Sequence, residues 1–119
     1  ERMDVWFAGD CDIQMGIAEL GSAVQSGAKP LILVLNNGSY GTIRMHQERD
    51  YPGRISGTTL VNPDFTAVAQ AYGMMGIKVA HTQEFAAAFK TLSEAPHGGI
   101  LELDISIEAI TPTKKLSEL

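Results

Sequence analysis

The sequence lacks the features that identify secreted, membrane-spanning or nucleic-acid-binding proteins. Its single cysteine, Cys11, can form no internal disulfide and no thiolate metal cage, so nothing points to an oxidising compartment. Apolar runs such as Leu31 to Leu35 are far shorter than the roughly 20 residues that span a bilayer, and no signal-peptide pattern opens the chain. Acidic residues outnumber basic ones, 14 to 9, which leaves no broad basic surface for nucleic acid or an anionic membrane. We therefore expect a soluble, cytoplasmic protein that binds neither.

The length of 119 residues and the hydrophobic content of 45% fit one domain with a modest core, spanning residues 1–119. The chain starts at Glu1 rather than methionine, and an apolar run, Val5 to Ala8, follows within a few residues. We expect it to be part of a longer protein.

Two continuous apolar runs, Val5 to Ala8 and Leu31 to Leu35, predict strands covered on both faces, as in a parallel sheet. Ile77 to Ala80 and Ile100 to Ile105 are further strand candidates. Helical patterns separate these strands, so the sequence predicts an α/β fold: a doubly wound, mostly parallel sheet with helices on both faces.

Three helices are expected between the strands. The first has its apolar face at Ile17, Leu20 and Val24 and ends at Gly27. The second begins at Asn62-Pro63-Asp64, interpreted as N-cap, N1 proline and acidic first turn. Thr82 is expected to cap the third, whose apolar residues are Phe85, Ala88, Phe89 and Leu92. Residues 51–61 are interpreted as a surface loop and the tail from Ile107 as an extended arm.

Polar turns follow the first two predicted strands, with Asp10 in one and Asn37 in the other. Strand ends in a parallel sheet meet at one edge, where α/β proteins bind ligands. A carboxylate and an amide offer only oxygen ligands, which Mg²⁺ prefers, and they leave positions open for a diphosphate. Neighbouring glycines and the start of a helix would favour such an anion. Taken singly, however, an Asp after a strand is most often a cap, and Asn36-Asn37-Gly38 is also a tight-turn sequence.

These residues resemble a known signature. Gly9-Asp10, the spacing of 27 to Asn37, and Leu35 to Gly41 are similar to the GDG…NN motif of thiamine-diphosphate enzymes, in particular the acetolactate synthase and benzoylformate decarboxylase group. The resemblance covers the whole chain and is sharpest from Ala8 to Arg44. It implies the diphosphate-binding domain of such an enzyme, with one strand and one helix expected before Glu1.

The resemblance also implies a set of site residues. Asp10, the Asn37 side chain and the Ser39 carbonyl would bind Mg²⁺. The residues around thiamine diphosphate would be Gly9, Asp10, Cys11, Asp12, Asn37, Ser39, Tyr40, Gly41 and Thr42. Cys11 stands where the family usually has glycine, which would cost on the order of 1 kcal/mol if the backbone there needs a positive φ. Asp12 adds a negative charge close to the expected phosphate.

The implied function is that of a lyase or transferase acting on 2-oxo acids, in which the cofactor serves as electron sink. The pyruvate decarboxylase branch has an acidic residue where this chain has Ile43. The activating glutamate belongs to a pyrimidine-binding domain, of the same or a partner subunit, and nothing here corresponds to it. We therefore expect a homo-oligomer when intact, and a chain that anchors the cofactor but is inactive alone.

Other interpretations remain open. The chain could be a non-catalytic binding or assembly module with a retained or decayed cofactor site, or a flavodoxin-like nucleotide or phosphate binder with similar turns. Cys11 as a nucleophile at a helix start is less favoured than a small turn residue. His46 and Arg49 are candidate substrate contacts, with a solvated helix face as the alternative. Tyr40 would pack on the cofactor or behind it.

Overall fold

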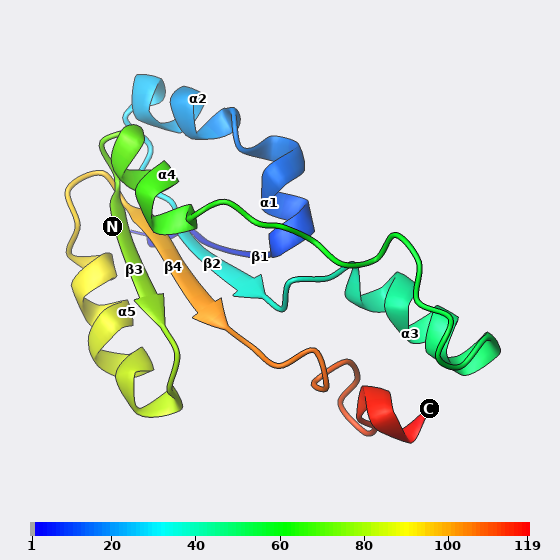
Figure 1. Cartoon of the computed structure of the whole chain (residues 1–119). Coiled ribbons are helices and arrows are strands. Elements are labelled where there is room, and N and C mark those ends of the chain that lie inside the picture. Colours follow the sequence, from blue (N-terminus) through cyan, green and yellow to red (C-terminus); the bar gives the residue numbers. More distant parts are fainter. Residues whose placement is uncertain (1) are drawn as a thin grey trace.

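A computed structural model describes residues Arg2 to Leu119 and shows a four-stranded parallel sheet in that part of the chain (Figure 1). The strands are β1 (Val5–Gly9), β2 (Leu31–Asn36), β3 (Met75–Val79) and β4 (Gly99–Asp104), in the spatial order β1-β2-β4-β3. The predicted α/β class and parallel sheet are confirmed. Each strand lies within two residues of its predicted bounds, because continuous apolar runs mark buried parallel strands clearly.

One face of the sheet is covered by α1 (Asp10–Gly16), α2 (Glu19–Ser26) and α4 (Phe65–Ala71). Between these helices and the sheet lies a core of nine buried residues, to which β2 contributes two alternate positions and β4 contributes one. These core residues are Ala8, Ile13, Leu20, Ile32, Val34, Phe65, Ala69, Met74 and Ile100.

The opposite face is covered by α5 (Phe85–Ser93), which follows a short 3₁₀ turn, η1 (Thr82–Glu84). Leu92 of α5 is fully buried, and Phe85 stacks with Phe89 at a centroid distance of 5.8 Å. The buried cluster on this face consists of Leu31, Leu33, Val79, Leu92 and Leu101. Helices on both faces agree with the doubly wound arrangement expected from the sequence.

The edge strand β1 is less well covered. Trp6 is 42% exposed, and Phe7, which faces the side of α5, is 65% exposed. Both residues belong to the apolar run from which a fully buried strand was expected. That expectation is wrong for the described chain. Phe7 is exposed because α5 lies over the other end of the sheet and does not reach β1 (Figure 1).

Several expected helix details differ in the structure. The N-cap of α4 is Asp64, whose carboxylate accepts the Ala67 N–H at 3.0 Å, so the prediction that Asn62 caps this helix is wrong. His81 rather than Thr82 precedes η1, and the Glu84 side chain closes that turn. Val24 is 40% exposed, so it does not belong to the core.

Beyond the carboxyl ends of β2 and β4, α3 (Gly41–Asp50) and the C-terminal tail project from the sheet (Figure 1). The tail is not the extended arm expected from the sequence. It turns back on itself and ends in η2 (Leu116–Glu118), with Glu108 accepting hydrogen bonds from the Ser117 N–H and hydroxyl at 3.0 and 2.8 Å. In residues 2–119, no helix combines the length and apolar character that a membrane crossing requires.

Candidate cofactor site

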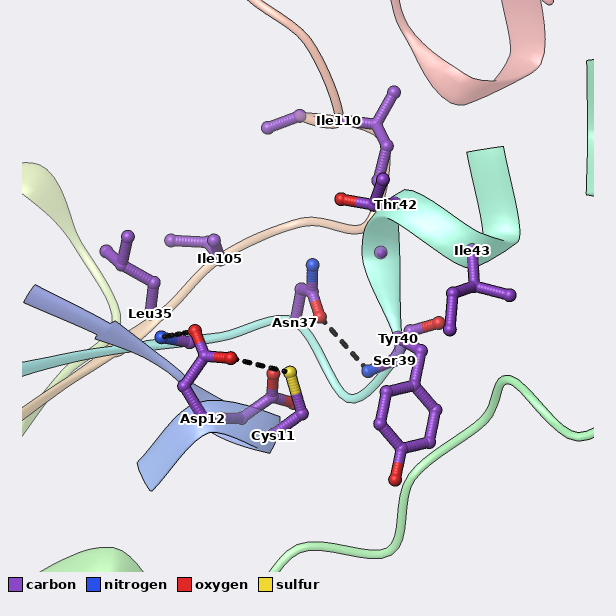
Figure 2. A pocket seen from close by; sticks show the side chains of 14 residues that line it. Cys11, Asp12, Leu35, Asn37, Ser39, Tyr40, Thr42, Ile43, Ile105 and Ile110 are labelled. Carbon is purple, nitrogen blue, oxygen red and sulfur yellow. Dashed lines mark hydrogen bonds between the residues drawn. The ribbon is translucent and has the colours of Figure 1, made fainter. Parts of the chain in front are cut away.

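A cavity of about 430 Å³ lies where β1 and β2 end. The residues around it come from the start of α1, the turn between β2 and α3, and the chain after β4 (Figure 2). All nine residues named from the sequence line this one cavity: Gly9, Asp10, Cys11, Asp12, Asn37, Ser39, Tyr40, Gly41 and Thr42. Five apolar residues complete the lining: Leu35, Ile43, Ile105, Ala109 and Ile110.

Asp10 is the first residue of α1 and is 2% exposed. Its Oδ2 atom accepts the Gly38 N–H at 2.9 Å and the Asn62 side-chain amide at 2.7 Å. The Oδ1 atom accepts no hydrogen bond from residues 2–119. In these residues, every side-chain oxygen or nitrogen that is shielded from solvent has a hydrogen-bond partner. Oδ1 is therefore accessible, and it faces the cavity that Asp10 lines.

The turn after β2 is rigidly held. Asn37 Oδ1 accepts the Ser39 N–H at 3.0 Å, and Gly38 takes a φ of +65°, a conformation that favours glycine (Figure 2). The Ser39 hydroxyl donates to the Thr58 carbonyl at 2.6 Å, which fastens the turn to the loop before α4. The Ser39 backbone carbonyl accepts no hydrogen bond from residues 2–119. The tight-turn interpretation of this segment holds, and it is compatible with a ligand role.

Cys11 and Asp12 sit in the first turn of α1. In residues 2–119 only glycines have a positive φ, so Cys11 carries no backbone strain from replacing a glycine. The Asp12 carboxylate accepts the Gly9 N–H at 3.0 Å and the Cys11 thiol at 3.6 Å. Burial, and then the charge of Asp12, raise the pKa of the Cys11 thiol above its usual range. That shift disfavours the thiolate and hence a nucleophilic role.

Sequence reasoning missed a polar cluster that backs the cavity. The Asn62 amide donates to Asp10 and, at 2.9 Å, to Asn36 Oδ1, and the Asn36 amide donates to Glu102 at 2.8 Å. Two signals could have identified it. Asn-Pro-Asp offers two capping side chains to a single helix, so Asn62 is in excess, and Glu102 is an isolated acid within an apolar strand.

Among residues 2–119, no basic side chain lines the cavity. Arg44 pairs with Glu48 at 2.8 Å and Arg49 pairs with Asp50 at 2.8 Å, both on α3. Neither His46 nor Arg49 reaches the lining, so the structure does not bring them together with Asp10. Residues 2–119 also contain no group of three or more His, Cys, Asp or Glu placed to hold a metal ion. Beside the carboxylates of Asp10 and Asp12 that line it, a metal at this cavity would therefore need carbonyl, amide and non-protein oxygens as ligands.

A parallel sheet with polar turns at its carboxyl edge defines the chain as an α/β cofactor-binding domain. Comparison with known proteins specifies which one: residues 1–104 match the family described as thiamine pyrophosphate enzyme, C-terminal TPP binding domain. The chain belongs to this family, as its motifs predicted.

Acetolactate synthases are among the proteins similar to this chain. The mitochondrial catalytic subunit of Saccharomyces cerevisiae is 36% identical over 105 residues, covering 88% of this chain and 15% of that protein. The large subunit of Buchnera aphidicola subsp. Schizaphis graminum is 40% identical, covering 84% of this chain and 18% of that protein. The isozyme 3 large subunit of Escherichia coli is 32% identical, covering 91% and 19% respectively. The chain thus spans less than a fifth of the length of these relatives.

Proposed function

We propose that this chain anchors Mg²⁺ and the diphosphate of thiamine diphosphate in an enzyme that acts on 2-oxo acids. The observation that carries the proposal is the state of Asp10: one carboxylate oxygen is held by two donors and the other opens to the cavity. Mg²⁺ in proteins is typically bound by one or two carboxylates together with phosphate oxygens and water. The donor set at this cavity fits that chemistry.

The shape of the cavity supports the proposal at Gly41. A Cβ on this residue would lie 3.0 Å from the Asn37 amide nitrogen and 3.0 Å from Ile110 Cδ1. The absence of a side chain therefore preserves space between the turn and the tail, where a ligand would be held. Gly41 also begins α3, a helix of 10 residues whose first amides are available to an anion.

The charge of the cavity supports a metal. Asp10 and Asp12 line it, and no lysine or arginine of the described part of the chain does. A diphosphate placed beside two carboxylates would be repelled unless a cation lay between them. Backbone amides alone carry only partial charges, so a divalent ion is the natural counter-charge.

In this proposal Asp10, Asn37 and the Ser39 carbonyl bind Mg²⁺, while Gly9, Cys11, Asp12, Tyr40, Gly41 and Thr42 surround the diphosphate. When bound, thiamine diphosphate supplies an electron sink for carbanion chemistry. The chain itself holds and orients the cofactor through these groups. A pyrimidine-binding domain, from the same or a partner subunit, would complete the active site in a cytoplasmic homo-oligomer, and the chain alone would be inactive.

Isothermal titration calorimetry of the 119-residue chain with thiamine diphosphate tests the proposal. We expect binding with Mg²⁺, and loss of that binding with EDTA or in the Asp10→Ala variant. No binding at millimolar cofactor would instead favour a decayed site in a non-catalytic module. Displacement by free nucleotides would favour a general nucleotide or phosphate binder.

A further inference from the structure

A line of polar side chains, half-buried at Asn62 and Asn36 and buried at Glu102, leads away from the cavity behind Asp10. Asn62 Nδ2 lies 2.7 Å from Asp10 Oδ2 and 2.9 Å from Asn36 Oδ1. Asn36 Nδ2 lies 2.8 Å from Glu102 Oε1. Glu102 is 3% exposed within β4, and the Lys78 ammonium group lies 3.3 Å from the same carboxylate oxygen. We name Asn62, Asn36 and Glu102 the Asn62 relay.

The strand register explains why these groups meet. Glu102 pairs with Val34 and with Lys78 across neighbouring strands, so all three side chains face the side of α4. Asn36 follows Val34 by two positions on β2 and therefore faces the same side. The loop that enters α4 brings Asn62 to this point. The relay thus continues the α4-side core with polar groups at the carboxyl edge of the sheet.

The relay has a fixed direction. A carboxylate only accepts hydrogen bonds, so Glu102 requires the NH₂ end of the Asn36 side chain. Asn36 then presents its Oδ1, which also accepts the Gly38 N–H at 3.1 Å. Because Asn36 Oδ1 can only accept, Asn62 donates to it through its NH₂ group, and the same group donates to Asp10 Oδ2. Asn62 Oδ1 accepts a hydrogen bond from the Gln14 side-chain amide at 2.7 Å.

The consequence for Asp10 is that Oδ2 is engaged and Oδ1 is left for the cavity. A carboxylate held in this way offers a metal one oxygen in one orientation. Mg²⁺ demands near-ideal octahedral geometry, whereas Ca²⁺ accepts six to eight ligands in flexible arrangements, including bidentate carboxylates. Without the Asn62 donor, Oδ2 would keep only the Gly38 N–H and would have a lone pair free for bidentate binding, and that change favours Ca²⁺.

We propose that Asn62 is a positioning residue that holds Asp10 for single-oxygen binding of Mg²⁺ and so favours Mg²⁺ over Ca²⁺, with Asn36 and Glu102 fixing its orientation. This inference rests on the proposed function of the site. It adds a residue outside the cavity lining whose effect on the metal passes entirely through Asp10.

The test compares Mg²⁺ and Ca²⁺ affinities by calorimetry with thiamine diphosphate present, for the 119-residue chain and its variants. Asn62→Leu keeps the side-chain size and removes its hydrogen bonds. We expect it to weaken Mg²⁺ binding about 10- to 100-fold, the usual effect of losing a partner that orients a metal ligand, and Ca²⁺ binding much less. Gln14→Leu is the matched control, since it leaves both Asn62 donors intact, and it should keep the native Mg²⁺ to Ca²⁺ ratio.

Circular dichroism confirms that each variant is folded at the temperature of titration. If Asn62→Leu does not fold, Asn62→Ala takes its place. It also removes the donor to Asp10 Oδ2 but adds no branched apolar side chain beside the polar groups, and the Mg²⁺ to Ca²⁺ ratio should fall in the same way.

Native metal affinities in the Asn62 variant, or equal losses of Mg²⁺ and Ca²⁺, would overturn the positioning role while leaving the proposed function intact. Absence of binding by the native chain, or unchanged binding by Asp10→Ala, would overturn the proposed function and the inference with it.

Discussion

Asn36 and Asn37 are adjacent and chemically identical, but they lie in opposite environments. Asn36 belongs to a closed side, formed with Asn62 and Glu102, in which neighbouring protein groups satisfy the polar side chains. Asn37 belongs to a cavity side, where Asp10 Oδ1 and the Ser39 carbonyl have no protein partner within residues 2–119. Changes on the closed side should therefore alter stability and reach the ligand only through Asp10, whereas changes on the cavity side should alter binding directly.

The largest effect on stability is expected from Glu102→Leu on the closed side. This change leaves the half-buried Asn36 amide without its protein acceptor, which should lower the free energy of unfolding by about 1 kcal/mol. Urea denaturation followed by circular dichroism measures the change. Glu102→Gln retains an acceptor of the same size and should lose much less, so equal losses in the two variants would mean that the hydrogen bond is not the cause.

On the cavity side, Gly41→Ala should weaken Mg²⁺-dependent binding of thiamine diphosphate without lowering stability. The added Cβ would crowd the Asn37 amide and Ile110 at 3.0 Å, a strain of roughly 1 kcal/mol or more and hence about a tenfold loss of affinity. Alanine is also a better helix former than glycine. Gly16→Ala is the control, because its Cβ would meet no atom within 4 Å. If Gly41→Ala binds with native affinity, the lack of a side chain at Gly41 is not needed for the ligand.

A smaller effect, in the opposite direction, is expected from Asp12→Asn. The asparagine oxygen can still accept the Gly9 N–H, but the negative charge beside the cavity is removed. Affinity for the Mg²⁺ complex of thiamine diphosphate should rise by roughly 1 kcal/mol, about fivefold. The gain should shrink as ionic strength increases, since salt screens the repulsion. Calorimetry at two salt concentrations measures the gain in affinity and its dependence on salt. Unchanged affinity in Asp12→Asn would show that the charge of Asp12 does not act on the ligand.

The smallest effect concerns the tail that carries Ala109 and Ile110 to the cavity. Hydrogen bonds from the Ser117 N–H and then from its hydroxyl lower the pKa of Glu108 below the ordinary glutamate value. A lowered pKa means that this contact stabilises the tail above the ordinary pKa and is lost as the pH falls through the folded-state pKa. Hydrogen exchange at the Ser117 amide should therefore lose protection in acid, and Glu108→Gln should remove that pH dependence. Persistent protection in acid would show that the tail is held elsewhere.

Local patterns were sufficient to predict the strands and the two turns. Val34 and its neighbours form a continuous apolar run, which identifies a buried parallel strand without knowledge of its partners. Asp10 and Asn37 were identified because each follows such a strand. Phe7 shows the limit of the same pattern, since burial of an apolar strand depends on which helix covers it.

Asn62 shows a second limit. Its neighbours match a helix start, and nothing local distinguishes a capping asparagine from one that turns toward a strand end 52 positions earlier. The capping role falls to Asp64, and Asn62 is left for Asp10. The hydrogen bond between Glu102 and Asn36 could likewise not be predicted, because the two residues lie 66 positions apart in the sequence.

The sequence by itself therefore determined the α/β class, the positions of the strands, and the family to which the domain belongs, because these follow from periodicity and short motifs within the chain. Only the tertiary structure decided which oxygen of Asp10 is engaged and which opens to the cavity. That choice depends on donors from Gly38 and Asn62, and hydrogen bonds form over about 3 Å whatever the separation along the chain.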